Sequence, residues 1–180
     1  MRPSTSIALF AVLALLLNLA LTTLAAEPLF PNGNYVIFKG TYHFPAGHKY
    51  FTGSPNPSNW AVTLESKSTT PDKLQVWKLR NHSSGSISLE LVGKSGYYLG
   101  EGRSGGLPGA YLGTNNANQQ KWKITRVLGG DLTKYKLTFP RKFQNRTLVV
   151  DDSPDSTTPT RIALAYEDLE ITQAFKFGSA

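Results

Sequence analysis

A five-residue phrase recurs three times along the chain and constrains the fold more than any other feature. Each copy reads Gln, any residue, an aromatic residue, Lys and an apolar residue. The copies are Gln75–Leu79, Gln120–Ile124 and Gln173–Phe177, and the last lies close to the end of the chain. One copy would carry no weight, but three at near-regular spacing predict three equivalent structural repeats of roughly 50 residues each.

The segments around these phrases divide into short runs in which apolar and polar residues alternate. A period of two, with Gly, Pro, Asn, Asp or Ser at the boundaries, is typical of β-strands with one buried face. The twelve predicted strands are Asn34–Lys39, His48–Gly53, Trp60–Ser66, Gln75–Asn81, Ser86–Gly93, Tyr97–Gly102, Gly109–Thr114, Gln120–Val127, Lys134–Arg141, Thr147–Asp152, Arg161–Glu167 and Gln173–Ser179. The connections are too short for crossover helices, so the sheet should be antiparallel. Because an open sheet would leave unpaired backbone at both edges, we expect a closed barrel with pseudo-threefold symmetry.

Residues 1–26 have the pattern of a secretory signal peptide. Arg2 precedes an uncharged apolar run, Ile7–Leu21, and Ala25 and Ala26 supply the small residues that a signal peptidase needs. The run is short for a membrane span, which takes about 20 residues. We therefore expect a secreted, extracellular mature protein without a membrane span.

The chain contains no cysteine. A disulfide framework, a thiol nucleophile and Cys-ligated zinc are thereby excluded, so the hydrophobic core alone must stabilise the secreted domain. Two sequons, at Asn81 and Asn145, predict N-glycosylation. We expect one domain over residues 27–180, with repeats at roughly 32–81, 85–127 and 132–180.

Twelve strands in three repeats, each ending in Gln-x-Trp or its Phe variant, resemble the β-trefoil fold and the motif of ricin-B-type lectin domains. The resemblance covers the whole mature chain and implies an all-β structure. In that family the motif aromatic packs in the core, which implies a structural role for Trp77, Trp122 and Phe175. The resemblance also implies carbohydrate binding without catalysis, with glycans or glycoproteins as partners.

Ricin-type sugar pockets use an Asp at the end of a repeat's second strand, an aromatic residue near the third strand, and a polar pair before the final aromatic. The carboxylate accepts hydrogen bonds from vicinal hydroxyls, the ring covers the apolar face of the sugar, and an amide completes the set. By this resemblance the third repeat offers Asp151, Tyr166 and Gln173, and the second offers Tyr111 and Gln120. No repeat has the complete set.

A second family resemblance leaves another function open. Cysteine-free mushroom trefoil protease inhibitors of the mycocypin-like group open with a Gly-x-Tyr-x-Ile phrase, as Gly33–Ile37 does here. This resemblance implies an inhibitor of a serine or cysteine protease that acts through exposed loops. Arg103, in the predicted loop Glu101–Pro108, is the candidate for the S1 pocket of a trypsin-like enzyme.

Charge leaves a third function open. The formal net charge is +7, and basic residues are frequent from the second repeat to the third. They are Lys121, Lys123, Arg126, Lys134, Lys136, Arg141, Lys142 and Arg146. Such a surface attracts polyanions in a salt-dependent way, so an acidic polysaccharide is a further candidate ligand.

Catalytic and cofactor-binding motifs are absent from the sequence. The histidines are His43, His48 and His82, without the spacing of metal ligands, and there is no nucleophile elbow and no phosphate-binding loop. We therefore predict a binding protein rather than an enzyme, with no cofactor and no metal. Nucleic acid is not expected as the partner of a secreted protein.

Overall fold

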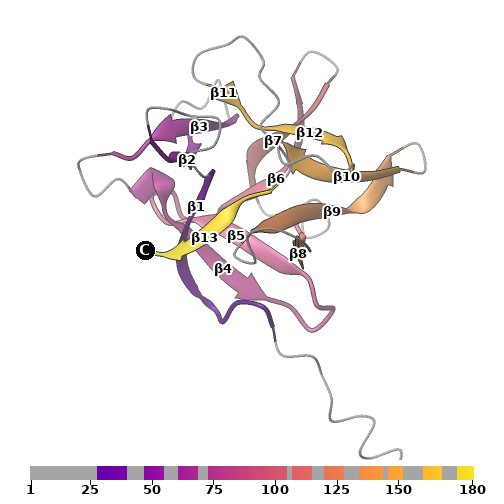
Figure 1. Cartoon of the computed structure of the whole chain (residues 1–180), viewed down its shortest axis with the longest axis horizontal. Helices are drawn as coiled ribbons and strands as arrows, with labels where there is room; N and C mark the ends of the chain where they lie inside the picture. Colours follow the sequence, from indigo (N-terminus) through magenta and orange to yellow (C-terminus); the bar gives the residue numbers. More distant parts are fainter. Residues whose placement is uncertain are drawn as a thin grey trace, which may run out of the picture.

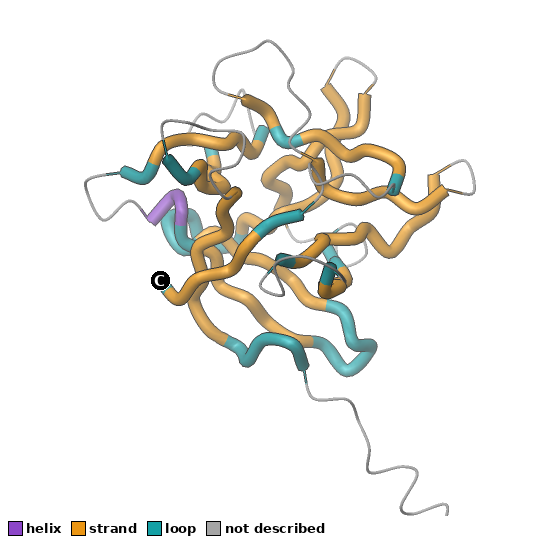
Figure 2. The backbone as a smooth tube through the Cα atoms, in the orientation of Figure 1, coloured by secondary structure: helices purple, strands orange, loops and turns teal. Residues whose placement is uncertain are grey.

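The computed structural model describes residues 28–39, 47–54, 61–68, 73–104, 107–114, 120–127, 134–143, 146–151, 160–167 and 174–180. These residues form a 13-stranded antiparallel sheet that curls on itself (Figures 1 and 2). The strands are β1 Gly33–Lys39, β2 Lys49–Gly53, β3 Val62–Ser66, β4 Trp77–Asn81, β5 Ile87–Leu91, β6 Tyr97–Ser104, β7 Leu107–Thr114, β8 Lys123–Arg126, β9 Tyr135–Phe143, β10 Arg146–Asp151, β11 Thr160–Arg161, β12 Ala163–Tyr166 and β13 Lys176–Ser179. A 3-10 turn, η2 (Lys73–Gln75), precedes β4.

The first and last strands of the repeats form a closed ring. Antiparallel ladders join β1 to β4, β4 to β5, β8 to β9, and β13 back to β1. Single bridges close the two remaining junctions, Ile87 with Trp122 and Tyr135 with Phe175. Because each of these strands has a neighbour on both sides, the ring has no open edge. The predicted closed, all-β barrel is therefore confirmed.

The middle strands of each repeat form a hairpin: β2 with β3, β6 with β7, and β10 with β12. The three hairpins gather at one end of the barrel (Figure 1). They are linked to one another because β11 pairs with β3 and β12 pairs with β7.

One predicted strand is divided in the structure. The sequence predicts a single strand over Arg161–Glu167, but β11 and β12 are separated at Ile162. There the chain changes partner from β3 to β7, and the Ile162 N–H donates to the Val62 carbonyl at 3.0 Å. The Ile162 side chain is buried, so this residue contributes to the core at the point where the main chain passes from one hairpin to the next.

The motif aromatics occupy the same place in each repeat. Within a repeat each one pairs with the opening strand; the pairs are Tyr35 with Trp77, Ile87 with Trp122, and Tyr135 with Phe175. All three motif side chains are fully buried. The indole N–H of Trp77 donates to the Phe51 carbonyl at 3.1 Å, and that of Trp122 donates to the Leu99 carbonyl at 2.8 Å. These bonds fix the second strand of a repeat to its last strand.

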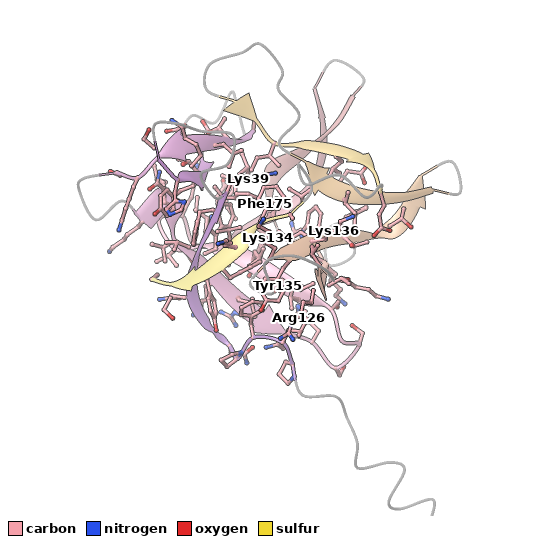
Figure 3. The ribbon with its side chains drawn as sticks, viewed as in Figure 1. Lys39, Arg126, Lys134, Tyr135, Lys136 and Phe175 are labelled. Atoms are coloured by element: carbon pink, nitrogen blue, oxygen red, sulfur yellow. The ribbon has the colours of Figure 1, made fainter. Side chains whose placement is uncertain are left out.

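The third repeat departs from this pattern at the barrel centre. The Phe175 side chain has no N–H to donate, and its ring packs against that of Phe51 in an edge-to-face arrangement, with 4.8 Å between the ring centres. Lys39 is only 3% exposed and holds its Nζ over the Phe175 ring, 4.9 Å from the ring centre (Figure 3). The register places Leu91 and Phe139 at the equivalent positions of the other repeats. A lysine therefore occupies a core position that is apolar in the other two repeats, over the aromatic face that attracts a cation.

Candidate functional site

Two of the sugar-site residues predicted in the third repeat belong to one hairpin. Asp151 ends β10 opposite Ala163, and Tyr166 ends β12 opposite Leu148. Ala163 and Tyr166 are three steps apart along β12, about 10 Å at the usual rise of a strand. Because this number of steps is odd, the register places the two predicted positions on opposite faces of the ladder, at its opposite ends. The structure therefore does not bring Asp151 and Tyr166 together on one face of the hairpin. The third predicted residue, Gln173, lies outside the described residues.

The second repeat places its two predicted residues differently. Tyr111 lies in β7 opposite Gly100 of β6. Gln120 is 5% exposed, and its Nε2 donates to the Gly113 carbonyl at 3.1 Å and to the Thr114 carbonyl at 2.7 Å. The amide nitrogen of Gln120 therefore holds the end of β7, and its role in sugar binding stays a prediction.

The motif glutamine of the first repeat, Gln75, also bonds to neighbouring segments, and it makes more hydrogen bonds than Gln120. Gln75 is buried; its Nε2 donates to Thr52 Oγ1 at 3.0 Å and to the Ser66 carbonyl at 2.9 Å, and its Oε1 accepts from the Ser68 N–H at 3.0 Å. Sequence reasoning missed this structural role of the motif glutamine. The signal was available, because the glutamine is present in the first repeat, which has Gly53 or Ser54 in place of the aspartate.

The sequence predicts an exposed loop over Glu101–Pro108, and this prediction is wrong because the segment belongs to a hairpin. Strands β6 and β7 pair continuously up to Ser104 and Leu107, and Arg103 lies opposite Pro108 within this hairpin. The hairpin projects from the body of the molecule (Figure 1). Only two residues, both glycine, separate the strands in the sequence, and this composition favours the tight turns of two-residue hairpins.

A shallow pocket lies beside β4. Its lining residues are Asn32, Gly33, Lys78, Leu79, Arg80, Asn81 and His82. Among these residues, Asn81 donates from Nδ2 to the Phe30 carbonyl at 2.8 Å and to Asn32 Oδ1 at 3.0 Å. The nitrogen that would carry a glycan at this predicted sequon thus joins the N-terminal segment to the barrel. Glycosylation of Asn81 stays a prediction, and the second sequon, at Asn145, lies outside the described residues.

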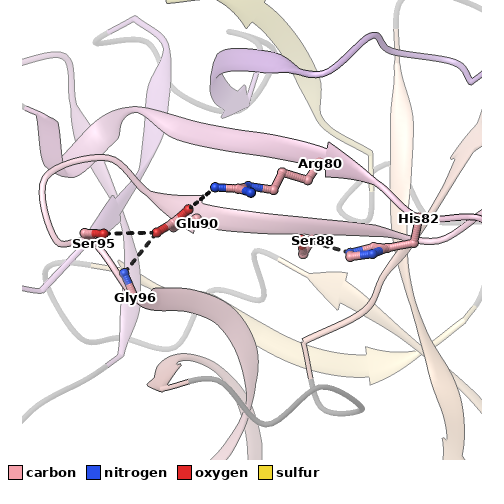
Figure 4. A network of polar contacts seen from close by, with 6 residues as sticks. All are labelled: Arg80, His82, Ser88, Glu90, Ser95 and Gly96. Atoms are coloured by element: carbon pink, nitrogen blue, oxygen red, sulfur yellow. Dashed lines mark hydrogen bonds and ion pairs between the residues drawn. The ribbon is translucent and has the colours of Figure 1, made fainter.

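The side of β4 and β5 that faces away from the barrel axis carries a polar network (Figure 4). Glu90 Oε1 accepts from the Gly96 N–H at 2.9 Å and from Ser95 Oγ at 3.3 Å, and Oε2 forms an ion pair with Arg80 at 3.4 Å. The Gly96 bond holds the pKa of Glu90 below its usual range, burial opposes this, and the charge of Arg80 lowers it further. Because Gly96 has a φ of +82°, the carboxylate stabilises a turn that needs glycine.

Among the residues that the structure describes, no three His, Asp or Glu side chains gather in the manner of a metal site. None of the described helical segments is long and apolar enough to cross a bilayer.

Comparison with known proteins identifies the fold. No protein-family model and no curated protein matches the chain. Among solved structures, the ricin B-like lectin of Macrolepiota procera, in complex with lactose, matches with a TM-score of 0.62 and 17% identity over 84% of this chain and 99% of the lectin. The BEL β-trefoil matches with a TM-score of 0.59 and 11% identity over 82% of this chain and 94% of that one. The protein therefore has a β-trefoil fold of the ricin-B type, as the sequence predicts.

The same fold also occurs as part of larger proteins. A mosquitocidal holotoxin matches with a TM-score of 0.63 and 16% identity over 84% of this chain. The matched region is 18% of the toxin, so this chain corresponds to less than a fifth of that protein.

Proposed function

We propose that this protein is a secreted, non-catalytic carbohydrate-binding protein that recognises glycans or glycoproteins through its third repeat. One observation carries the proposal: the chain matches a lectin, solved in complex with lactose, over 99% of that lectin's length. A closed barrel with hairpins gathered at one end is a rigid scaffold on which exposed residues can serve binding, because the core supplies the stability.

The proposed site lies on the β10–β12 hairpin. The Asp151 carboxylate accepts hydrogen bonds from two vicinal hydroxyls, the Tyr166 ring stacks on the apolar face of the sugar, and Gln173 supports the polar edge. The register of the ladder places these two positions at opposite ends and on opposite faces of the hairpin, so support for this site comes from the fold comparison and not from the register. The second repeat is the weaker candidate, because the amide nitrogen of Gln120 already donates to two carbonyls. Affinity for a single small sugar is expected to be low.

The test is a glycan array with the mature chain, residues 27–180, at low and at high salt. Asp151→Asn removes the carboxylate charge at constant shape and is expected to abolish binding of neutral sugars with the Tm unchanged. Glu167→Gln is the matched control, because Glu167 is an exposed acidic residue directly after β12, and it should bind as the unmodified chain does. Tyr166→Phe should retain stacking and binding, whereas Tyr166→Ala should lose both.

Two results would contradict the proposal. The first is Asp151→Asn binding neutral sugars as well as the unmodified protein. The second is a blank array from a sample that inhibits trypsin or papain tightly. Loss of that inhibition in Arg103→Ala would then replace carbohydrate binding by protease inhibition through the β6–β7 hairpin.

A further inference from the structure

The barrel has three outer faces, one at each junction between repeats, and their positions can be compared one by one. The faces are formed by β4 with β5, β8 with β9, and β13 with β1. The same main-chain hydrogen bond closes each of them: His82 to Ser86 at 2.9 Å, Val127 to Lys134 at 3.0 Å, and Ala180 to Asn34 at 3.2 Å. Residues at matching register positions therefore occupy equivalent places on the three faces.

The lysine of the repeated phrase occupies the same outward position on each face, but the residue opposite it differs. Lys78 lies opposite Glu90, Lys123 opposite Thr138, and Lys176 opposite Phe38. The alternate residues of these strands, such as Trp77, Trp122 and Leu137, are buried in the barrel, so the compared positions face away from its axis. The three faces of one symmetric barrel thus carry an acidic, a polar and an apolar residue at the same point.

The next outward-facing pair of positions also differs between the three faces. On the β4–β5 face Arg80 lies opposite Ser88, and its charge is paired with that of Glu90. On the β8–β9 face Thr125 lies opposite Lys136. On the β13–β1 face Gly178 lies opposite Val36. The first face contains its own counter-charge, and the third is largely apolar.

The β8–β9 face concentrates positive charge. Lys123, Lys134 and Lys136 occupy three of its six described outer positions, and none of the six is acidic. Lys121 and Arg126 flank it, with Arg126 and Lys123 exposed. Figure 3 shows Arg126, Lys134 and Lys136 around β8 and β9. Like charges in neighbouring strands raise the local potential, which attracts a ligand that carries several negative charges.

We propose that the β8–β9 face binds an acidic polysaccharide, a chain that carries sulfate or carboxylate groups. The described outer positions of this face hold lysine, threonine and valine, without the carboxylate and the stacking ring that a neutral sugar requires. Recognition by charge is therefore the chemistry that this surface offers. It uses none of the residues of the proposed neutral-sugar site, so the two proposals can fail separately.

Heparin immobilised on agarose is the probe, and the readout is the NaCl concentration that elutes the mature chain. Lys123→Gln is expected to lower this concentration, with a two- to fivefold weaker Kd in solution, as for the loss of one exposed charge contact. The matched control is Lys78→Gln, the same change at the equivalent position of the face that contains Glu90, and its elution should not change. Lys123→Gln with Lys136→Gln should weaken binding further than either change alone.

Thr138→Glu tests the comparison of faces directly, because it places a carboxylate where Glu90 stands on the β4–β5 face. This variant is expected to elute at clearly lower salt, whereas the neutral Thr138→Gln should elute as the unmodified chain does. Thermal unfolding of each variant separates a lost charge contact from a lost fold.

Three outcomes would overturn the proposal. One is an equal loss in Lys78→Gln and Lys123→Gln, which would mean that overall charge and not this face is responsible. Another is elution from heparin at no higher salt than from a sulfopropyl cation exchanger. The third is competition by duplex DNA as strong as that by soluble heparin, which would assign the surface to a different class of polyanion.

Discussion

Replacement of Gln120 by leucine separates a structural role of the motif glutamine from a role in ligand binding. Leucine fills a similar volume but cannot donate to the carbonyls of Gly113 and Thr114. Thr114 is exposed, so water can replace the lost donor there at a cost of about 1 kcal/mol. Gly113 is half-buried, and leaving its carbonyl without a donor costs about 2 kcal/mol of stability. The free energy of unfolding should therefore fall by roughly 3 kcal/mol.

Thermal unfolding followed by circular dichroism measures this loss. For a domain of this size a loss of 1 kcal/mol lowers the Tm by about 2–4 °C, so Gln120→Leu should melt roughly 6–12 °C below the unmodified chain. Gln75→Leu should lose at least as much, because Gln75 makes three such bonds. Glycan binding by the folded Gln120→Leu protein should be unchanged. An unchanged Tm together with lost glycan binding would refute the reasoning and assign Gln120 to the ligand.

Three further results are expected. Trp122→Phe should lower the free energy of unfolding by about 2–4 kcal/mol in a urea titration, because it leaves the Leu99 carbonyl without its donor and removes buried ring atoms. Glu90→Gln should lower stability at neutral pH but not at acidic pH: the depressed pKa of Glu90 contributes stability above the ordinary carboxyl pKa, and this is lost as the pH falls through the folded-state pKa. Asn81→Asp should release the N-terminal segment, seen as faster proteolysis near Phe30, because the amide donor is lost.

The repeated phrase was enough to predict the architecture because it marks the same point of three equivalent units. The alternation of apolar and polar residues then located the inner face of each strand. In β1 the inward positions are Tyr35, Ile37 and Lys39, and all three side chains are buried. A charged residue at the end of a strand does not by itself indicate burial. Its place became clear only from the register, which sets it beside Phe175 from the far end of the chain.

The break at Ile162 was not predicted because it depends on a contact between repeats. It follows from a change of strand partner from β3 to β7, which has no local signature. The bonds of Gln120 lie within its own repeat, to carbonyls six and seven residues earlier in the chain, and the recurrence of the glutamine in all three repeats was the signal for them. The β6–β7 hairpin is different, because two adjacent glycines between extended runs are a local signal for a tight turn. The loop predicted over this Gly-rich segment is wrong, because its flanks continue the strands.

Symmetry in this barrel separates what the fold requires from what is left for function. A side chain that recurs at the same register position in each repeat is explained by the barrel itself, as for the buried motif aromatics and the paired opening strands. A position that differs between repeats is not needed for closure, because the other repeats close without it. Glu90, Thr138 and Phe38 differ in this way at one point of the outer surface. Because the barrel tolerates an acid, a hydroxyl and an aromatic ring there, each face can acquire its own ligand without loss of the fold.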